Sequence, residues 1–316
     1  MKKCIFIIIF VSIGLGTAAD TLYPKELVKI PYSHFEKCGI DYFYVDGDSL
    51  YIMDYYNEQI KEFSISKGIA SNTYKNVIGS YSRDPHFVVA GDEILIMADP
   101  VFYVYNKKTK NYVREMYRTK DMKVRLSSNS TLFDNNKLYF TMYGGHRIYK
   151  IWDNGKITDP IDLNQEYGYP INDKQTFIAD QTKRDYLELT IINKWKNSIY
   201  RIPKTGGTRY LGIINDLIIF VERKRPNMDE FWDEIVCFSL KEKKVTKRLR
   251  VPQIYFAPLK NNFVVNNEKL YYLMSAKDGL HLFELAFTPP SDGKDPFEKF
   301  NYTIDPPKRI VPMRGE

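Results

Sequence analysis

The sequence predicts an all-β fold assembled from one repeated strand pair, on three observations. The 316-residue chain contains 25 Tyr and 19 Phe, and aromatic and β-branched side chains favour the half-buried surface of a sheet. Turn residues such as Asn-Gly and Gly-Gly follow several short apolar runs, as tight hairpins require. The strand pair recurs at an average interval of about 44 residues, which lies in the range of propeller blades.

The clearest copy of the repeat is LYIMDYYNEQIKEFSISKG, residues 50–68. Its sequence indicates a strand, a polar step, a second strand and a turn at Lys67-Gly68. The second strand carries Ile60 and Phe63, whose side chains point to opposite faces because a strand has a period of two. Such a strand needs apolar cover on both sides, which neighbouring blades of a ring provide.

The apolar pair recurs five more times, each time after another strand-like run. The later pairs are Phe102 and Tyr105, Ile148 and Ile151, Ile199 and Ile202, Ile235 and Phe238, and Leu282 and Leu285. The six preceding runs are 49–53, 93–98, 137–142, 186–192, 216–221 and 269–274. Hairpin residues follow most pairs, among them Gly206-Gly207. Six such units predict a six-bladed β-propeller of four-stranded antiparallel blades. The fourth and fifth units lie closest together, so seven blades or an irregular ring stay open.

The two ends of the chain must meet to close such a ring. We expect a terminal strand from one end to complete the blade formed by the other, with 297–304 and 40–45 as the candidates. The propeller is expected to span 20–305. Residues 306–316 should form an extended or disordered C-terminal tail, because this segment is rich in Pro and charge.

The first unit resembles an NHL-type propeller repeat in Leu50-Tyr51-Ile52-Met53-Asp54, Asn57, Ile60 and Phe63. Residues 198–207, SIYRIPKTGG, resemble the YWTD-like repeats of lipoprotein-receptor propellers. Both families repeat the Asp that the first unit has as Asp54. The other five units depart from the families at this position, where they carry Ala98, Met142, Ile191, Val221 and Met274. The resemblance implies a six-bladed ring and, by analogy, a binding role without a specified ligand. Asp54 and Asn57 do not recur, so they serve this blade alone, as its turn or as part of a site.

Residues 1–19 have the features of a secretory signal peptide. Lys2 and Lys3 precede a short apolar core, and Thr17-Ala18-Ala19 supplies small residues for cleavage. We therefore expect a secreted, extracellular monomer without membrane contact, or a periplasmic one if the host is bacterial. An uncleaved membrane anchor is the alternative.

The expected compartment decides whether the sequons can be glycosylated and whether the cysteines can form a disulfide. Asn129 and Asn301 begin Asn-x-Thr sequons that could carry glycan in a eukaryotic secretory pathway, although such short motifs also arise by chance. Signal cleavage leaves Cys38 and Cys237. The two could form a disulfide in an oxidising compartment, or both could be buried thiols, which the apolar run 235–240 around Cys237 favours.

The chain carries a formal net charge of +7, and its basic residues gather in three runs, 222–225, 241–244 and 247–250. Such a patch could attract heparin-like polyanions. The same runs are more typical of solvated loops and hairpin tips with interspersed Glu. Export argues against a nucleic-acid partner.

Neither a zinc-protease, a dithiol nor a serine-hydrolase motif occurs after the signal peptide. His86 follows Arg83-Asp84-Pro85 in an expected loop between blades, where propellers place functional groups, so it is the first candidate site residue. Lactonase-type propellers hold calcium at the central tunnel with Glu, Asn and Asp from different blades. The comparable residues here are Asn193, Asn215, Asp99 and Asp180, although Asn and Asp equally serve turns.

The sequence thus predicts a secreted binding module that recognises a protein or glycan through one face of the ring, without catalysis or cofactor. A secreted, lactonase-like, metal-dependent hydrolase with its site at the central tunnel is the alternative, and Ca²⁺ would be its metal. Carboxylates and His gathered at one tunnel mouth, with shifted pKa values, would indicate the enzyme. Lys, Tyr and Asn there would indicate binding.

Overall fold

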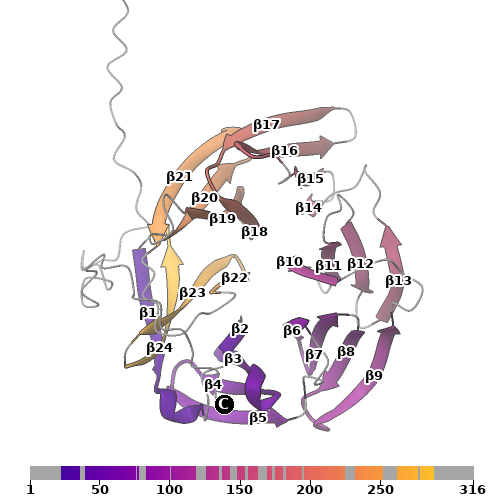
Figure 1. Ribbon diagram of the computed structural model, residues 1–316, viewed down its shortest axis with the longest axis vertical. Helices are drawn as coiled ribbons and strands as arrows, with labels where there is room; N and C mark the ends of the chain where they lie inside the picture. The colour runs from indigo at the N-terminus through magenta and orange to yellow at the C-terminus, as the bar shows by residue number, and fades with distance from the viewer. Residues whose placement is uncertain are drawn as a thin grey trace, which may run out of the picture.

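The computed structural model describes 24 strands and two short 3-10 helices, and the strands form six four-stranded sheets. The sheets stand around a central axis like the blades of a propeller (Figure 1). The described residues are 23–35, 40–75, 77, 83–99, 101–118, 126–134, 137–142, 148–153, 156–162, 169–172, 175–180, 183–193, 196–224, 232–251, 262–276 and 278–287.

Each blade is antiparallel, and its strands follow one another outward from the axis (Figure 1). The inner strands are β2 (Ile40–Asp46), β6 (Arg83–Ala90), β10 (Leu126–Asp134), β14 (Tyr169–Asn172), β18 (Gly207–Ile214) and β22 (Phe263–Asn266). The second strands are β3 (Ser49–Asp54), β7 (Glu93–Asp99), β11 (Lys137–Met142), β15 (Gln175–Asp180), β19 (Leu217–Lys224) and β23 (Lys269–Ala276). The third strands are β4 (Gln59–Ser64), β8 (Val101–Asn106), β12 (Ile148–Asp153), β16 (Tyr186–Asn193), β20 (Trp232–Ser239) and β24 (Gly279–Ala286). The outer strands are β5 (Ile69–Lys75), β9 (Asn111–Arg118), β13 (Lys156–Asp162), β17 (Asn197–Pro203), β21 (Lys244–Val251) and β1 (Tyr23–Ile30). The predicted all-β propeller architecture is therefore confirmed, and the six four-stranded sheets fit the predicted number of blades.

Contacts between inner strands join equivalent ends of those strands. Tyr42 contacts His86 near the starts of β2 and β6, and Asn266 donates a hydrogen bond to the Val45 carbonyl near the ends of β22 and β2. The inner strands therefore run in one direction along the axis. We call the face at which they begin the top face and the opposite one the bottom face.

The ring is closed by β1, which pairs with β24 as the outer strand of the sixth blade. A terminal strand was expected in this role, but the candidate segment 40–45 is wrong. It forms β2, the inner strand of the first blade, because the adjacent side chains Phe43 and Tyr44 point to opposite faces and both are buried, so the strand requires cover on both sides. The other candidate, 297–304, lies outside the described residues.

The expected two-sided cover is present for the three third-strand pairs whose side chains are both described. Ile60 and Phe63 are fully buried, as are the later pairs Ile235 with Phe238 and Leu282 with Leu285. Blade 4 is the exception, since Ile199 is 62% exposed. Its third strand is β16, whereas Ile199 and Ile202 lie on the outer strand β17, so the fourth copy was assigned one strand too late.

Correcting this assignment makes the repeat more regular. The second strand of blade 4 is β15 and not 186–192, so the shortest interval between successive second strands lengthens from 30 to 38 residues. Gly206-Gly207 also changes its role. The pair does not close a hairpin, because Gly206 lies in the link from blade 4 to blade 5 and Gly207 begins β18.

A repeated contact at the bottom face links the two turns of a blade. The turn between the first and second strands carries an Asp whose main-chain carbonyl accepts an N–H from the turn between the third and fourth strands. The pairs are Asp48 with Ile65 (2.7 Å), Asp92 with Lys107 (2.8 Å) and Asp216 with Leu240 (2.9 Å). The side chains add to the contact, as Ser239 donates to the Asp216 carboxylate at 3.0 Å. Each of these hairpin pairs is thus fixed within its own blade.

Blade 4 has a short inner strand, since β14 consists of four residues, as does β22 of blade 6. Beside it, β18 of blade 5 contacts both β10 of blade 3 and β22 of blade 6. The strand β18 therefore lies among inner strands from several blades. Within the described part of the chain, no helix has the length and apolar character needed to cross a bilayer.

We predict that Gly206→Ala destabilises the protein. A Cβ at Gly206 would lie 1.6 Å from the Arg223 carbonyl oxygen, so the main chain of β19 would have to move. Overpacking of this kind costs about 1–3 kcal/mol in the free energy of unfolding. Gly207→Ala is the matched control, since nothing lies within 4 Å of a Cβ there. Equal denaturation midpoints for the two variants would contradict the described link between blades 4 and 5.

Candidate functional site

Three inner strands bring polar side chains together near the top of the central axis. Tyr42 lies on β2, His86 on β6 and Arg209 on β18. The ring centroids of Tyr42 and His86 are 4.8 Å apart, and both side chains are buried. Arg209 is half-buried, and its charge acts on the Tyr42 hydroxyl. We call these three residues the axial cluster.

Burial controls the protonation of this cluster. It raises the pKa of Tyr42 to about 12, against an opposing effect of Arg209. Burial likewise lowers the pKa of the Arg209 guanidinium to about 10, against opposing effects of Tyr42 and Asp233. At neutral pH the phenol is therefore neutral and the guanidinium charged. The cluster offers O–H and N–H donors beside aromatic rings.

His86 was expected in a loop between blades, and this prediction is wrong. Residues 83–90 form β6, and a register shift against β7 falls between Arg83 and His86. The shift contains Pro85, which has no N–H to donate, and Pro is tolerated at bulges and on edge strands. As the inner strand, β6 has a neighbour within its blade on one side only. The irregular strand start places His86 against Tyr42 instead of in solvent.

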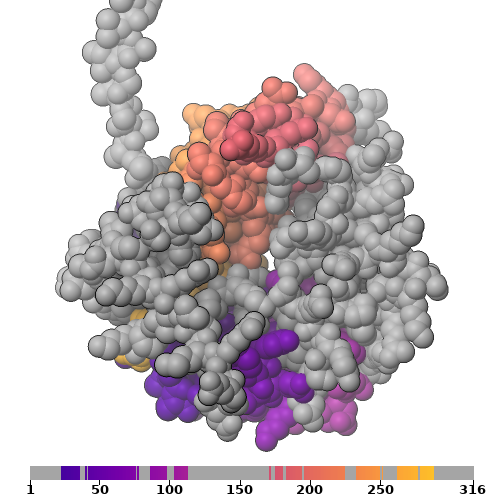
Figure 2. Space-filling model, viewed as in Figure 1, coloured from indigo at the N-terminus to yellow at the C-terminus, as the bar shows by residue number. Residues whose placement is uncertain are grey.

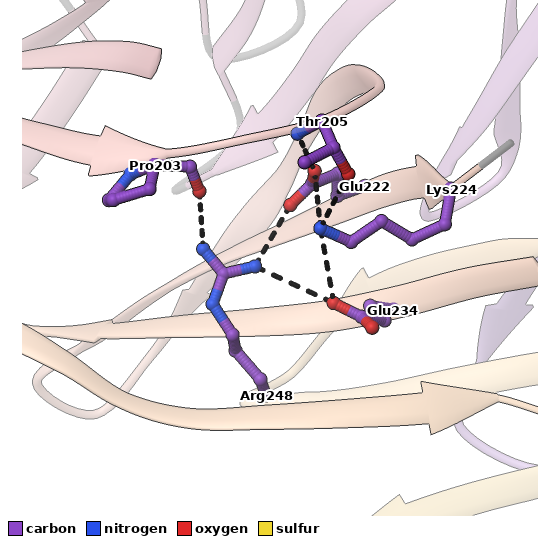
Figure 3. Close-up of polar contacts among 6 residues, drawn as sticks. All are labelled: Pro203, Thr205, Glu222, Lys224, Glu234 and Arg248. Carbon is purple, nitrogen blue, oxygen red and sulfur yellow. Dashed lines mark hydrogen bonds and ion pairs between the residues drawn. The ribbon is translucent and has the colours of Figure 1, made fainter. Parts of the chain in front are cut away.

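A second group of charges joins the top of blade 5 to the link from blade 4. We call Glu222, Lys224, Glu234 and Arg248 the blade 5 ion cluster (Figure 3). The Glu222 carboxylate accepts hydrogen bonds from the Thr205 N–H at 2.6 Å, Lys224 Nζ at 2.7 Å and Arg248 Nη1 at 2.9 Å. Arg248 also donates to the Pro203 carbonyl at 2.6 Å (Figure 3). These contacts hold the inter-blade link against β19 and β21.

The blade 5 ion cluster corrects the interpretation of the basic run 222–225. Glu222 is 1% exposed, and Glu222 and Lys224 belong to β19, so 222–224 is neither a solvated loop nor a free polyanion patch. Glu222 and Glu234 lie opposite each other on paired strands. Lys224 and Arg248 contact both carboxylates. Two cations thus offset a like-charge pair that would otherwise be unfavourable.

Asp54 and Asn57 form a local turn at the top of blade 1. The fully buried Asp54 carboxylate accepts Asn57 Nδ2 at 2.8 Å and Gln59 Nε2 at 3.0 Å. These bonds enclose the 3-10 helix η2 (Tyr55–Asn57). Of the two roles left open, the structure shows the turn. The turn leaves Tyr56 65% exposed at the top face.

The four residues compared with lactonase ligands are not brought together. Asn193 ends β16 at the bottom face, where its Oδ1 accepts the Lys196 N–H at 2.8 Å. Asn215 lies in the bottom turn after β18, with a φ of 53°. Asp99 and Asp180 end β7 and β15 at the top face. The four residues therefore do not form one ligand set, and the two Asn residues serve turns on the opposite face, which is the other role that the sequence predicts for them.

The remaining predicted positions are separate from the axial cluster. Cys237 is a buried free thiol on β20, and burial raises its pKa to about 12. Asn129 falls within β10. Cys38 and Asn301 lie outside the described residues. The free thiol of Cys237 agrees with the buried-thiol alternative and not with the disulfide, and glycosylation at Asn129 and Asn301 stays a prediction. Across the ranges that the structure describes, no group of three or more His, Cys, Asp or Glu could hold a metal ion.

Sequence reasoning missed Tyr42 and Arg209. Their signal was local: a charged residue in the strand GTRYLGII, and Tyr42 near the start of the strand IDYFYVD. No spacing in the sequence indicates that the starts of these two strands lie close to the start of β6.

Glu222→Gln tests the ion cluster. Burial alone would raise the pKa of Glu222, but hydrogen bonds from Lys224, Thr205 and Arg248 lower it overall. Its contribution is therefore present above the unfolded-state pKa, about 4.3, and is lost as the pH falls through the lower folded-state value. The variant should lose about 1–3 kcal/mol of unfolding free energy at pH 7. The difference from wild type should shrink as the pH falls below about 4.

Urea unfolding at several pH values measures this difference. Glu242→Gln is the control, because Glu242 pairs with Lys244 at the surface, with its side chain 52% exposed, and such pairs contribute about 0–1 kcal/mol. If the two variants behaved alike at every pH, the ion cluster would have no role in joining the blades.

Comparison with known proteins gives a match in fold. No protein-family model matches the chain, and no curated protein matches it. Regucalcin from Agrobacterium tumefaciens, described as a calcium-binding protein, aligns at 11% identity over 84% of this chain and 95% of its own, with a TM-score of 0.51. A nidogen/laminin complex aligns at 14% identity over 67% and 80%, with a TM-score of 0.44. Kluyveromyces lactis Hsv2 aligns at 10% identity over 85% and 77%, with a TM-score of 0.43. At these identities the likeness is one of fold: the chain is a β-propeller.

Proposed function

We propose that this β-propeller is a binding module that recognises a protein or glycan partner through the top face of its ring, without catalysis of its own. The axial cluster carries the proposal. Three blades contribute a phenol, an imidazole and a guanidinium to one place. Tyr and Arg are the side chains enriched at binding hot spots, because they combine large contact area with directional donors.

The protonation of Tyr42 favours a role in binding over acid–base catalysis by this residue. A catalytic base or nucleophile needs a pKa near the working pH. The pKa of Tyr42 instead moves away from neutrality, to about 12, so the phenol stays protonated and can donate a hydrogen bond. Tyr56 adds an exposed aromatic ring at the same face. Together they supply a polar centre and an exposed apolar side chain at one face.

The proposed place of action is outside the cell, or the periplasm of a bacterial host. The basic, apolar and small-residue segments of 1–19 support export. The sequons at Asn129 and Asn301 fit a glycoprotein if the host is eukaryotic. A monomer that binds one partner is the simplest form of this proposal.

A secreted metal-dependent hydrolase is the second candidate, supported by the fold likeness to a protein described as calcium-binding. It requires ligands around the axis at the top face. Asp180 is a described carboxylate at that face, and its charge acts on Lys204, which is buried. Metal content separates the two candidates.

Tyr56→Ala tests the proposed face. We expect at least about tenfold weaker partner binding, since truncating a hot-spot aromatic side chain costs about 2 kcal/mol or more, with little change in stability because the side chain is exposed. The partner is first identified by capture on the immobilised full chain from extracellular fluid and from a glycan array. Affinity is then measured by surface plasmon resonance.

Tyr112→Ala is the matched control, because Tyr112 is 43% exposed on the outer strand β9. It should bind the partner as wild type does. Loss of binding in the Tyr112 variant together with full binding in the Tyr56 variant would place the partner on the rim of blade 2 and overturn the proposal.

Elemental analysis of the purified full chain tests the alternative. We expect calcium and zinc well below one ion per chain after dialysis against buffer without chelator. A stoichiometric metal that survives dialysis, together with esterase or lactonase turnover abolished by a chelator, would replace the binding proposal with the hydrolase.

A further inference from the structure

Two arginines and one aspartate lie on the same side of blade 5 near its top edge. Arg209 on β18 pairs in register with Val221 of β19, and Gly207 pairs with Arg223. Arg223 in turn lies opposite Asp233 of β20. Side chains two residues apart on a strand share a face. Arg209, Arg223 and Asp233 are therefore neighbours on one surface.

The single carboxylate of this group is already engaged. Asp233 is 2% exposed and accepts two hydrogen bonds from Arg223, at 2.9 Å from Nε and 3.1 Å from Nη2. This bidentate pairing fixes the Arg223 guanidinium. Within the described part of the chain, Arg209 makes no direct ion pair or hydrogen bond. Among the side chains that the structure describes on this surface, two guanidinium groups share one carboxylate, so the positive charges exceed the negative ones by one.

The unbalanced charge lies close to the axis. Arg209 comes from β18, the strand that contacts inner strands of blades 3 and 6. Its charge acts on Tyr42 of blade 1 as well as on Asp233 and Arg223 of its own blade. Arg209 is half-buried as a residue, and burial lowers the pKa of its guanidinium, so the charge has lost part of its hydration. In the space-filling view, blade 5 borders the centre of the ring (Figure 2).

An oxyanion can neutralise a partly desolvated guanidinium that has no counter-ion and accept its hydrogen bonds. Its planar donors fit the two oxygens of a carboxylate, sulfate or phosphate group. The protonated Tyr42 hydroxyl can add a donor, and the second guanidinium, Arg223, contributes long-range attraction. We propose that Arg209 and Tyr42 form an oxyanion site at the top of the axis, which receives an acidic group of the bound partner. This inference rests on the proposed function and specifies its ligand chemistry.

Anion-dependent thermal unfolding of the full chain tests the site, with sodium sulfate, phosphate and acetate as separate probes at constant ionic strength set by sodium chloride. The wild-type melting temperature should rise in a saturable way with at least one of the three anions. Arg209→Gln should weaken the apparent affinity about 10- to 100-fold, as expected for loss of a charged hydrogen bond. Arg209→Lys keeps the positive charge but lacks the planar guanidinium, so its apparent anion affinity should lie between those of wild type and Arg209→Gln.

Arg201→Gln is the matched control, because Arg201 lies on the outer strand β17 with its side chain 70% exposed. It should respond to anions as wild type does. An equal rise in all four proteins would mean general salt stabilisation and would overturn the site. Wild-type anion affinity in a folded Arg209→Gln variant, confirmed by circular dichroism and isothermal titration calorimetry, would overturn it too.

The test of the oxyanion site and the test of the proposed function can fail independently of each other. If no anion acts through Arg209 but Tyr56→Ala still loses the partner, the top face stands and the oxyanion site is wrong. If sulfate, phosphate or acetate acts through Arg209 but Tyr56→Ala keeps full partner binding, the oxyanion site stands and the face proposed for the partner is wrong.

Discussion

The ring depends on the antiparallel pairing of β1 with β24. Without it, the third strand of blade 6 would present unpaired N–H and C=O groups at an open edge. The side chains reinforce the pairing, since Lys29 forms an ion pair with Asp278 at 2.5 Å and His281 contacts Glu26 at 2.6 Å. The backbones approach closely at Gly279, where a Cβ would lie 2.6 Å from the Ile30 carbonyl oxygen. Every other blade is complete within a continuous stretch of chain, so closure is the one pairing that unites the two ends.

The sequence predicted the parts of the fold whose pattern is set by burial on two faces. Ile60 with Phe63 and Ile235 with Phe238 show that pattern because neighbouring blades cover both sides of a third strand. Blade 4 was assigned one strand late because Ile199 and Ile202 of its outer strand show the same spacing, although one face is open to water. The closing strand YPKELVKI was not identified for a related reason. It alternates buried with exposed positions, as an outer strand does, and lacks the continuous apolar run that marked the repeat.

The candidate site was less predictable than the fold, because it is assembled from residues far apart in the chain. The sequence predicted His86 as a site residue, but in a loop between blades, whereas it lies on the strand β6. Tyr42 and Arg209 lie on other blades, and no spacing in the sequence indicates that the starts of β2, β6 and β18 converge. The ion cluster was hidden in a similar way. Glu222 and Lys224 belong to a run of charges typical of a surface loop, and only strand pairing reveals that the Glu222 carboxylate is buried with three donors. The sequence shows which charged residues are present, whereas only the tertiary contacts show which charges offset one another.

The turn-to-turn contacts at Asp48, Asp92 and Asp216 span short stretches of chain, whereas β1 and β24 are separated by roughly 250 residues. The turn-to-turn contacts within a blade can therefore form as soon as that blade has been synthesised. At about 5–20 residues per second, the ribosome needs roughly 10–50 s to reach β24 after β1 has been completed. Throughout that interval β1 is an amphipathic segment without its partner, and the growing ring has two unsealed edges. A cell that makes this protein must keep those edges apart from other chains until synthesis ends, so the yield of correctly closed rings is set by protection during synthesis as well as by the stability of the finished fold.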